Sequence, residues 1–411
     1  MRQNSSRISA DHKWVSVSFL ALAEVCALSL WFSATALIPA LKAEFEFSDF
    51  HASLFSSSVA IGFIIGTFIS ALLSLADRYP PRLIFTGCAL VAASSNAAIL
   101  LFDPLSETVI LLRIITGITM AGIYPIGMKM IATWAKKDAG LLVGLLVGAL
   151  TLGSAMPHIL NVFQIGWLDW RFTLIGSSLL AVLSACLIQV VRLGNPIPKA
   201  PPFDIALALH GWRDKAIRLA NFGYFGHMWE LYAMWAWIGI FLYESFKLSL
   251  APDPSFQANL VTFITIGIGA AGSLLAGKVA DKVGRTGTTM VAMIISGSCA
   301  ALIGLAFGSS PVLVSVICLI WGISIVADSA QFSTCVIELS PPNMIGTMLT
   351  LQTCTGFLIS LITIHLVPYS AELFGWKFAF LPLAIGPLLG TVAMWRLRYQ
   401  PRAVQMAGGR K

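Results

Sequence analysis

Charged residues are scarce in this chain. They make up 11% of its 411 positions, whereas 57% of the residues are hydrophobic. A soluble globular domain carries about 25% charged residues, so this composition excludes that class. Apolar runs of about 20 residues recur along the sequence, which is the length that an α-helix needs to cross a membrane. The alternating segments of a membrane β-barrel are missing, so the sequence predicts an all-α membrane protein.

The motifs of metal sites, disulfide frameworks and catalytic centres are also missing. The seven cysteines form no Cys-x-x-Cys pair and all lie in or at the ends of apolar runs, which argues against a disulfide framework or a zinc site. The sequence contains no nucleophile–base set and no ATP-binding loop, so we expect no enzyme and no cofactor. Residues 267–272 match Gly-x-Gly-x-x-Gly, but they lie within an apolar run, where glycines favour close helix packing.

The apolar runs predict twelve membrane-spanning helices. They cover residues 14–39, 50–75, 83–102, 106–128, 139–163, 171–193, 217–243, 257–278, 287–308, 311–335, 345–368 and 377–397. The longest polar break, at 194–216, is rich in proline and predicts an extended cytoplasmic linker. It divides the chain into an N-terminal six-helix bundle at 1–193 and a C-terminal six-helix bundle with a short tail at 217–411.

Lys and Arg are distributed unevenly between the loops. If both termini face the cytoplasm, 21 of the 26 Lys and Arg residues fall in cytoplasmic segments and four in external ones. This excess is typical of cytoplasmic loops. The sequence therefore predicts a multi-pass protein of the cytoplasmic (inner) membrane with both termini inside. The net charge of +7 is then explained by cytoplasmic loops that lie against anionic lipid. We therefore expect no nucleic-acid partner.

The two halves of the chain repeat one another. Glu24 and Trp31 recur 206 residues later as Glu230 and Trp237. Ionisable side chains inside an apolar span are costly, so an acid kept at the same place in both halves suggests function. A repeat of this length in an apolar chain is typical of a transporter built from two parallel halves.

Two loop motifs resemble those of the major facilitator superfamily. That family has Gly-x-x-x-Asp-Arg-x-Gly-Arg-Arg after its second helix and a degraded copy after its eighth. Here the better copy is the second, Gly277-Lys-Val-Ala-Asp281-Lys282-Val-Gly284-Arg285. The first copy keeps Asp77, Arg78 and Arg82 but has Leu73, Pro80 and Pro81 where the family has Gly, Gly and Arg. In helix 4, residues 113–121 resemble the family's Arg-x-x-x-Gly-x-x-x-Ala pattern, whose Arg is associated with proton coupling.

The resemblance covers the whole chain and implies a fold. It implies twelve helices in two six-helix bundles related by pseudo-twofold symmetry, as in bacterial-type twelve-helix members. It also implies alternating access, with helices 1, 4, 7 and 10 around a central cavity. The resemblance implies that the two halves rock against one another between two states. A network of charges that forms in one state and breaks in the other could latch the halves, so the loop motifs are candidates for such a latch. The latch residues would be Asp77, Arg78, Asp281, Lys282 and Arg285, unless these charges only fix the topology.

Four ionisable residues within apolar runs are candidates for proton coupling. They are Glu24, Glu230, Arg113 and Asp328. The two glutamates lie about 10 and 13 residues into their helices, near the bilayer midplane, where the neutral form of a carboxyl is favoured. The alternative is a structural glutamate bonded to a neighbouring helix. Arg113 could pair with Glu24, bind a substrate anion or pin two helices together, and Asp328 could line the cavity or cap a helix.

Aromatic and polar side chains are candidates for solute binding. They are Trp31, Tyr124, His158, His227, Tyr232, Trp237, Gln331 and His365. Aromatic rings can stack on a planar or cationic solute, and histidine can relay protons. His227 precedes Glu230 by three residues, a spacing at which two helical side chains can interact. For each of these residues, ordinary helix packing is the competing interpretation.

These features predict a secondary active transporter that moves a small organic solute by alternating access, coupled to protons. Three acids in the spans oppose Arg113 alone, which disfavours a small inorganic anion. An organic-anion (monocarboxylate-type) carrier, a metal or metal-chelate carrier and a uniporter without proton coupling remain alternatives, although no metal-ligand spacing occurs. The expected partners are the solute, protons and the lipid bilayer, and we expect a monomer without a bound metal.

Overall fold

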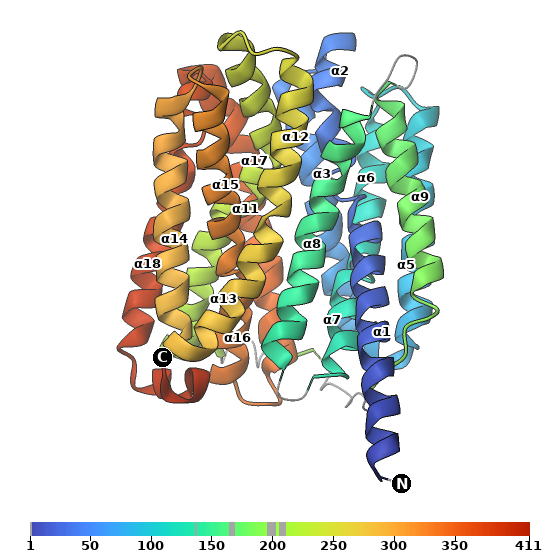
Figure 1. Ribbon diagram of the computed structural model, residues 1–411, viewed down its shortest axis with the longest axis vertical. Helices are drawn as coiled ribbons and strands as arrows, with labels where there is room; N and C mark the ends of the chain where they lie inside the picture. Colours follow the sequence, from blue (N-terminus) through green and yellow to red (C-terminus); the bar gives the residue numbers. More distant parts are fainter. Residues whose placement is uncertain (1, 136–137, 164–168, 195–202, 205–210) are drawn as a thin grey trace.

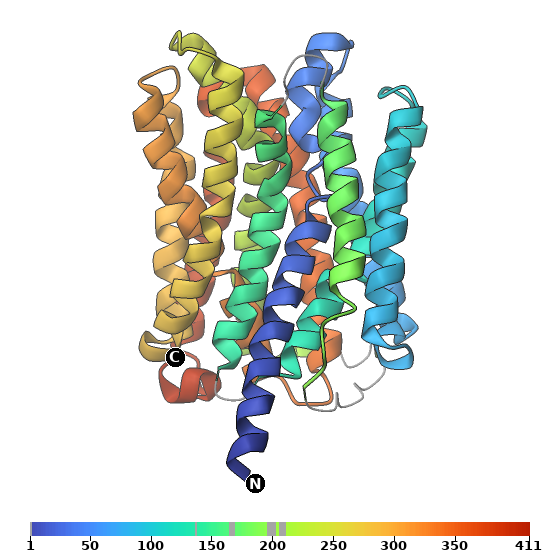
Figure 2. The same ribbon diagram turned by 45° about the vertical axis from the view of Figure 1, so that its right-hand side comes forward.

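The computed structural model describes residues 2–411 except 136–137, 164–168, 195–202 and 205–210. Long helices run side by side along one direction, and the described residues contain no strand (Figure 1). Both chain termini lie at the same end of the molecule, which we call the terminal face (Figure 2). We call the opposite end the far face.

The N-terminal half contains nine α-helices within the described residues. They are α1 (Arg2–Leu28), α2 (Ile38–Glu44), α3 (Asp49–Leu72), α4 (Leu75–Arg78), α5 (Pro81–Ala98), α6 (Glu107–Met120), α7 (Tyr124–Ala132), α8 (Ala139–Val162) and α9 (Arg171–Leu187). Two 3-10 helices, η1 (Thr35–Leu37) and η2 (Ile99–Leu101), accompany them.

The C-terminal half is built in the same way. Its α-helices are α11 (Lys215–Leu248), α12 (Pro254–Gly267), α13 (Gly269–Val283), α14 (Arg285–Leu302), α15 (Pro311–Ala327), α16 (Ser329–Leu339), α17 (Ile345–Phe374) and α18 (Ile385–Arg398). Its 3-10 helices are η3 (Ile303–Ala306), η4 (Trp376–Phe378), η5 (Leu381–Ala384) and η6 (Pro401–Gly409).

The helices account for the twelve predicted spans. In the described part of the chain, nine helices or end-to-end helix pairs are long and apolar enough to cross a membrane. The apolar α9 is shorter, at 17 residues. Helices α1 and α11, with 27 and 34 residues, run alongside the others (Figure 1). The chain is therefore a multi-pass, all-α membrane protein.

Several spans differ from the prediction because they are interrupted. The span expected at 14–39 stops being helical after Leu28, the span at 106–128 breaks between α6 and α7, and the span at 311–335 breaks at Asp328. The span at 257–278 breaks at Ile268. Pro125, in the first turn of α7, has no amide hydrogen to continue a helix. Breaks within spans are a common feature of transporters.

Helix packing separates contacts within each half from contacts between the halves. In the N-terminal half α3 packs on α6 and α1 on α8 and α9, and in the C-terminal half α11 packs on α17 and α18. Between the halves α8 contacts α12 and α13, and α3 contacts α17. The predicted linker at 194–216 falls largely outside the described residues, so the domain boundaries stay a prediction.

Candidate functional site

Glu24 is a buried acid without a hydrogen-bond partner among the described residues. Its side chain is fully buried in α1, and neither carboxyl oxygen has a partner there. The carboxyl group lies against Gly127 of α7, where a Cβ atom would overlap Glu24 Oε1. Tyr124, at the start of α7, lies within electrostatic range of the same carboxyl group. Because an unpaired carboxylate is costly to bury, this position suits a group that gains and loses a proton.

Glu230 occupies the matching place in α11 but has different surroundings. Trp321 Nε1 donates a hydrogen bond of 2.7 Å to Glu230 Oε1, and Ser296 Oγ donates one of 2.9 Å to Oε2. Both partners belong to neighbouring helices of the same half, α15 and α14. These are the contacts of a glutamate bonded to adjacent helices, which is the alternative considered for it from the sequence.

His227 is paired with Asp328 rather than with Glu230. His227 Nδ1 lies 2.9 Å from Asp328 Oδ1, and the two side chains are 1% and 2% exposed. Asp328 lies at the break between α15 and α16, one turn before Gln331. Removing one partner of a buried pair of this kind strongly destabilises the folded protein, because the other partner is left buried without its contact. It joins helices 7 and 10, which the family resemblance assigned to the cavity lining.

Arg113 binds the backbone where α1 ends. Its guanidinium group donates to the carbonyl oxygens of Leu30 at 3.0 Å and Trp31 at 2.7 Å. It also donates to Ser33 Oγ at 3.1 Å and, at 3.4 Å, to the carbonyl oxygen of Phe55 in α3. No ion pair joins it to an acid within the described residues. The guanidinium group therefore supplies hydrogen bonds to carbonyl groups at the place where the helix is interrupted.

Six aromatic side chains fill the space where the two halves meet. This aromatic cluster consists of Trp31, Phe32, Phe63, Tyr232, Trp235 and Phe357, all of them buried. The ring of Tyr232 lies 5.6 Å from that of Trp31 and 4.7 Å from that of Phe357, measured between centroids. Phe63 lies 4.8 Å from Phe357. Sequence reasoning selected Trp31 and Tyr232, but the other four rings carried no distinguishing signal.

The remaining predicted binding residues lie apart from the aromatic cluster. Trp237 donates a 2.8 Å hydrogen bond to the carbonyl oxygen of Ile364 in the same half, so it packs α11 on α17. Gln331 accepts a 2.9 Å hydrogen bond from Arg285. His365 Nε2 lies 3.1 Å from Ser57 Oγ and so joins the halves. His158 lines a small cavity of about 20 Å³ between α8, α11 and α12.

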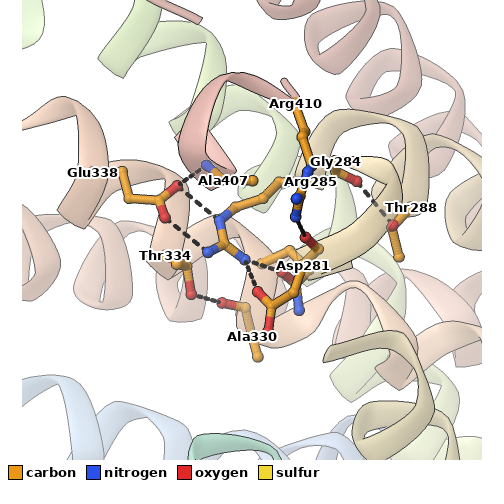
Figure 3. A network of polar contacts seen from close by, with 10 residues as sticks. Asp281, Gly284, Arg285, Thr288, Ala330, Thr334, Glu338, Ala407 and Arg410 are labelled. Carbon is orange, nitrogen blue, oxygen red and sulfur yellow. Dashed lines mark hydrogen bonds and ion pairs between the residues drawn. The ribbon is translucent and has the colours of Figure 1, made fainter. Parts of the chain in front are cut away.

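The second loop motif forms a network of charges at the terminal face (Figure 3). Arg285 donates two hydrogen bonds of 2.7 Å to the carboxylate of Glu338 in α16. Its Nη1 atom lies 3.5 Å from Asp281 Oδ1, while Lys282 is exposed. A Cβ atom built on Gly140, at the start of α8, would lie 3.1 Å from Asp281 Oδ2. Asp281 therefore faces a helix N-terminus of the other half, where a negative charge is favoured.

The first loop motif makes its contacts within its own half. Asp77 Oδ1 accepts a 2.5 Å hydrogen bond from Lys129 Nζ in α7. Arg78 is exposed and forms no ion pair among the described residues. Asp77 also lines a cavity of about 180 Å³ that it shares with Thr347 of α17. Sequence reasoning missed Lys129 and Glu338, although each is a charged residue near the terminal end of a span.

Comparisons with known proteins agree with this fold. A family model described as Major Facilitator Superfamily matches residues 20–364. The partially occluded inward-open xylose transporter XylE from E. coli is 17% identical, with a TM-score of 0.72 over 94% of this chain and 98% of that one. The proton:xylose symporter XylE bound to 6-bromo-6-deoxy-D-glucose is 15% identical, with a TM-score of 0.71 over 94% and 96%.

A third structure, a bacterial homolog to the human lysosomal transporter Spinster in an inward-facing and unoccupied conformation, is 14% identical. Its TM-score is 0.72 over 95% of this chain and 99% of that one. A comparison with curated proteins gives no match. At these identities the solved structures show a shared fold.

Proposed function

The chain belongs to the major facilitator superfamily, and on this premise we propose that it is a proton-coupled carrier of a small organic solute. The superfamily fold and the apolar helices support a multi-pass secondary transporter. The proposal adds alternating access, coupling to protons and a place in the cytoplasmic membrane with the terminal face inside. The excess of Lys and Arg on that face supports this orientation.

The observation that carries the proposal is the carboxyl group of Glu24, which has no hydrogen-bond partner in the part of the chain that the structure describes. It is buried beside Gly127 and within electrostatic range of Tyr124. When the site is closed, apolar surroundings favour a neutral carboxyl; when it opens to water, the carboxylate is hydrated and can form. Because the two conformations then differ in their affinity for a proton, proton binding shifts the balance between them.

The aromatic cluster supports an organic solute. Trp31 and Phe63 come from the N-terminal half, whereas Tyr232 and Phe357 come from the C-terminal half, so rocking of the halves would open a surface of rings. Aromatic faces bind planar and cationic groups. The guanidinium group of Arg113 is occupied by backbone carbonyls. No cation among the described spans is thus left beside the cluster for a substrate carboxylate, which disfavours the organic-anion alternative.

The second loop motif supports alternation between two states. Asp281 lies against the start of α8 across the interface between the halves. Within its own half, Asp281 is paired with Arg285, which is paired in turn with Glu338. Opening at the terminal face would separate Asp281 from the helix N-terminus. The first loop motif contributes less to contact between the halves, because Asp77 is paired with Lys129 of its own half.

Transport in proteoliposomes tests the proposal. The solutes would be xylose, a neutral amino acid, a quaternary ammonium ion and lactate, each with and without an imposed pH gradient. We expect Glu24→Gln to abolish accumulation driven by the gradient while solute exchange at equal pH continues. Glu107→Gln, at an exposed acid of the N-terminal half, is the matched control. Wild-type accumulation by Glu24→Gln would refute the proton role, and accumulation of lactate alone would favour the organic-anion carrier.

A further inference from the structure

A long groove lies on the outer side of the C-terminal half, away from the interface between the halves. Its volume is about 1060 Å³, at the upper end of the range of small-molecule sites. All the described residues that line it belong to α11, α17, α18 and the residues that follow α18. Neither the candidate transport residues nor the aromatic cluster contribute to it. The groove is therefore separate from the candidate transport site.

The groove exists because α11 and α18 are held together by glycines. A Cβ atom on Gly226 would lie 2.8 Å from the Cα atom of Gly390 and would overlap the carbonyl oxygen of Gly386. This close approach of the backbones leaves large side chains only along the edges. Trp229, at the inner end of the groove, is fixed by a 3.0 Å hydrogen bond from its Nε1 atom to the carbonyl oxygen of Pro382.

The length of the groove matches one leaflet of a bilayer. Its lining runs from Arg396 to Ile385 along α18, a span of about 16 Å at 1.5 Å per residue. Along α11 it runs from Lys215 to Trp229, about 21 Å by the same rule. Half of the hydrocarbon core is about 15 Å thick. The groove thus reaches from the headgroup region at the terminal face to the middle of the membrane.

Charge is concentrated at one end of the groove. Lys215, Arg218 and Arg396 line it near the terminal face, and none of the described residues that line it is an acid. Arg218 donates one hydrogen bond to the carbonyl oxygen of Trp212, which orients the guanidinium group without neutralising it. The nearby Asp214 is paired with Arg402. A basic end of this kind attracts an anionic headgroup.

The rest of the groove is apolar and open to the bilayer. Phe222, Leu389 and Trp395 line it and are 46%, 62% and 53% exposed. We propose that this groove binds one anionic phospholipid of the leaflet at the terminal face. Its phosphate lies over Lys215, Arg218 and Arg396, and an acyl chain follows Phe222 and Leu389 to Trp229. The shape, length and charge of the groove distinguish this site from the general lipid-facing surface.

Native mass spectrometry of the full-length protein, purified in detergent with phosphatidylglycerol or phosphatidylcholine, tests the proposal. The retained lipid is counted at equal added lipid. We expect retained phosphatidylglycerol to fall about tenfold in Arg218→Gln/Arg396→Gln, since two basic contacts are lost, and to recover in Arg218→Lys/Arg396→Lys. Lys278→Gln, at an exposed lysine outside the groove, is the control and should bind as the wild type does.

Two further measurements distinguish the effect of the groove's shape on lipid binding from the effect of its basic residues. Val392→Trp fills the groove without changing charge and should also lower phosphatidylglycerol binding, while thermal unfolding confirms that the variant is folded. Glycerol 3-phosphate, which has the phosphate but no acyl chain, should not compete. Unchanged binding in the Arg218→Gln/Arg396→Gln variant, unchanged binding in folded Val392→Trp, or full competition by glycerol 3-phosphate would each overturn the proposal.

Discussion

Glu24 and Glu230 hold matching positions in the two halves, yet their hydrogen bonding is different. Glu230 is bonded to Trp321 and Ser296, whereas Glu24 has no partner among the described residues. An acid with two donors is held in one geometry. A carboxylate without donors is stabilised most when water reaches it. Glu24 is therefore better suited than Glu230 to exchange a proton, and Glu230 is better suited to a structural role.

Gly127 makes room for Glu24, and its replacement should show how tightly the carboxyl group is packed. In Gly127→Ala, the added Cβ atom would overlap Glu24 Oε1, and we expect a loss of about 1–3 kcal/mol from overpacking. Thermal unfolding in detergent measures the loss. The double variant Glu24→Ala/Gly127→Ala should recover stability relative to Gly127→Ala, because the clashing atom is gone. Equal destabilisation in the single and double variants would contradict the contact.

Asp214 gives a pH-dependent effect outside the membrane. It caps α11 by accepting hydrogen bonds of 2.9 Å and 3.0 Å from the amides of Ala216 and Ile217. Burial alone would raise the pKa of Asp214, but the amide of Ile217 and the guanidinium group of Arg402 outweigh it and hold the pKa below its ordinary value. A lowered folded-state pKa means that the stabilisation is present at neutral pH and is lost as the pH falls through that value, below about 4.

Asp214→Ala should therefore lower the free energy of unfolding by about 1 kcal/mol at neutral pH. The difference from the wild type should shrink as the pH falls below about 4 and the wild-type carboxyl takes up its proton. Asp214→Asn is the matched control, because asparagine caps helices as well as aspartate does. Thermal unfolding across a pH series measures both effects. A pH-independent difference would argue against a charged cap.

At the scale of the helices, the interruption of the first span depends on Arg113. The guanidinium group donates to the carbonyl oxygens of Leu30 and Trp31, which lie in the segment that follows the end of α1. In a membrane the lost helical hydrogen bonds must be replaced by protein groups. The same arginine contacts α3 through Phe55, so it fixes the position of the break relative to a neighbouring helix.

Removal of this side chain should destabilise the whole N-terminal half. We expect Arg113→Ala to lower the free energy of unfolding by about 3 kcal/mol or more, since the buried carbonyl groups of Leu30 and Trp31 each lose a charged hydrogen-bond donor. Arg113→Lys should recover part of this, because an ammonium group cannot reproduce the forked geometry of a guanidinium. Thermal unfolding and the yield of monodisperse protein report the effect. If Arg113→Ala were as stable as the wild type, the capping role would be excluded.

At the scale of the whole molecule, much of the architecture was predictable from the sequence. Apolar runs gave the twelve spans, and the repeated Glu–Trp spacing identified two acids that are indeed buried. The breaks at Asp328 and between α6 and α7 were not predicted, because the apolar pattern continues through them. The partners Gly127, Trp321 and Glu338 were not predicted either, since such contacts join helices far apart in sequence and leave no local signal.

Ser57 and His365 offer a way to immobilise the halves against one another. They belong to α3 and α17, and His365 Nε2 lies 3.1 Å from Ser57 Oγ. We expect a Ser57→Cys/His365→Cys variant, bridged by a short bis-methanethiosulfonate reagent, to lose transport and to regain it on reduction. Each single variant treated with the same reagent is the control. Transport that persists in fully bridged protein would show that the halves need not move at this point.

Small residues along α8 keep one flank of the molecule tightly closed. Gly148 lies against Ala270 of α13, and Gly144 lies against Ser273 and Leu274 of the same helix. The opposite flank, between α3 and α17, already encloses a cavity beside Asp77. The same α8–α13 flank carries the contact between Asp281 and the start of α8. A bulky residue at Gly144 or Gly148 would therefore push α8 away from α13 and weaken that contact at the terminal face.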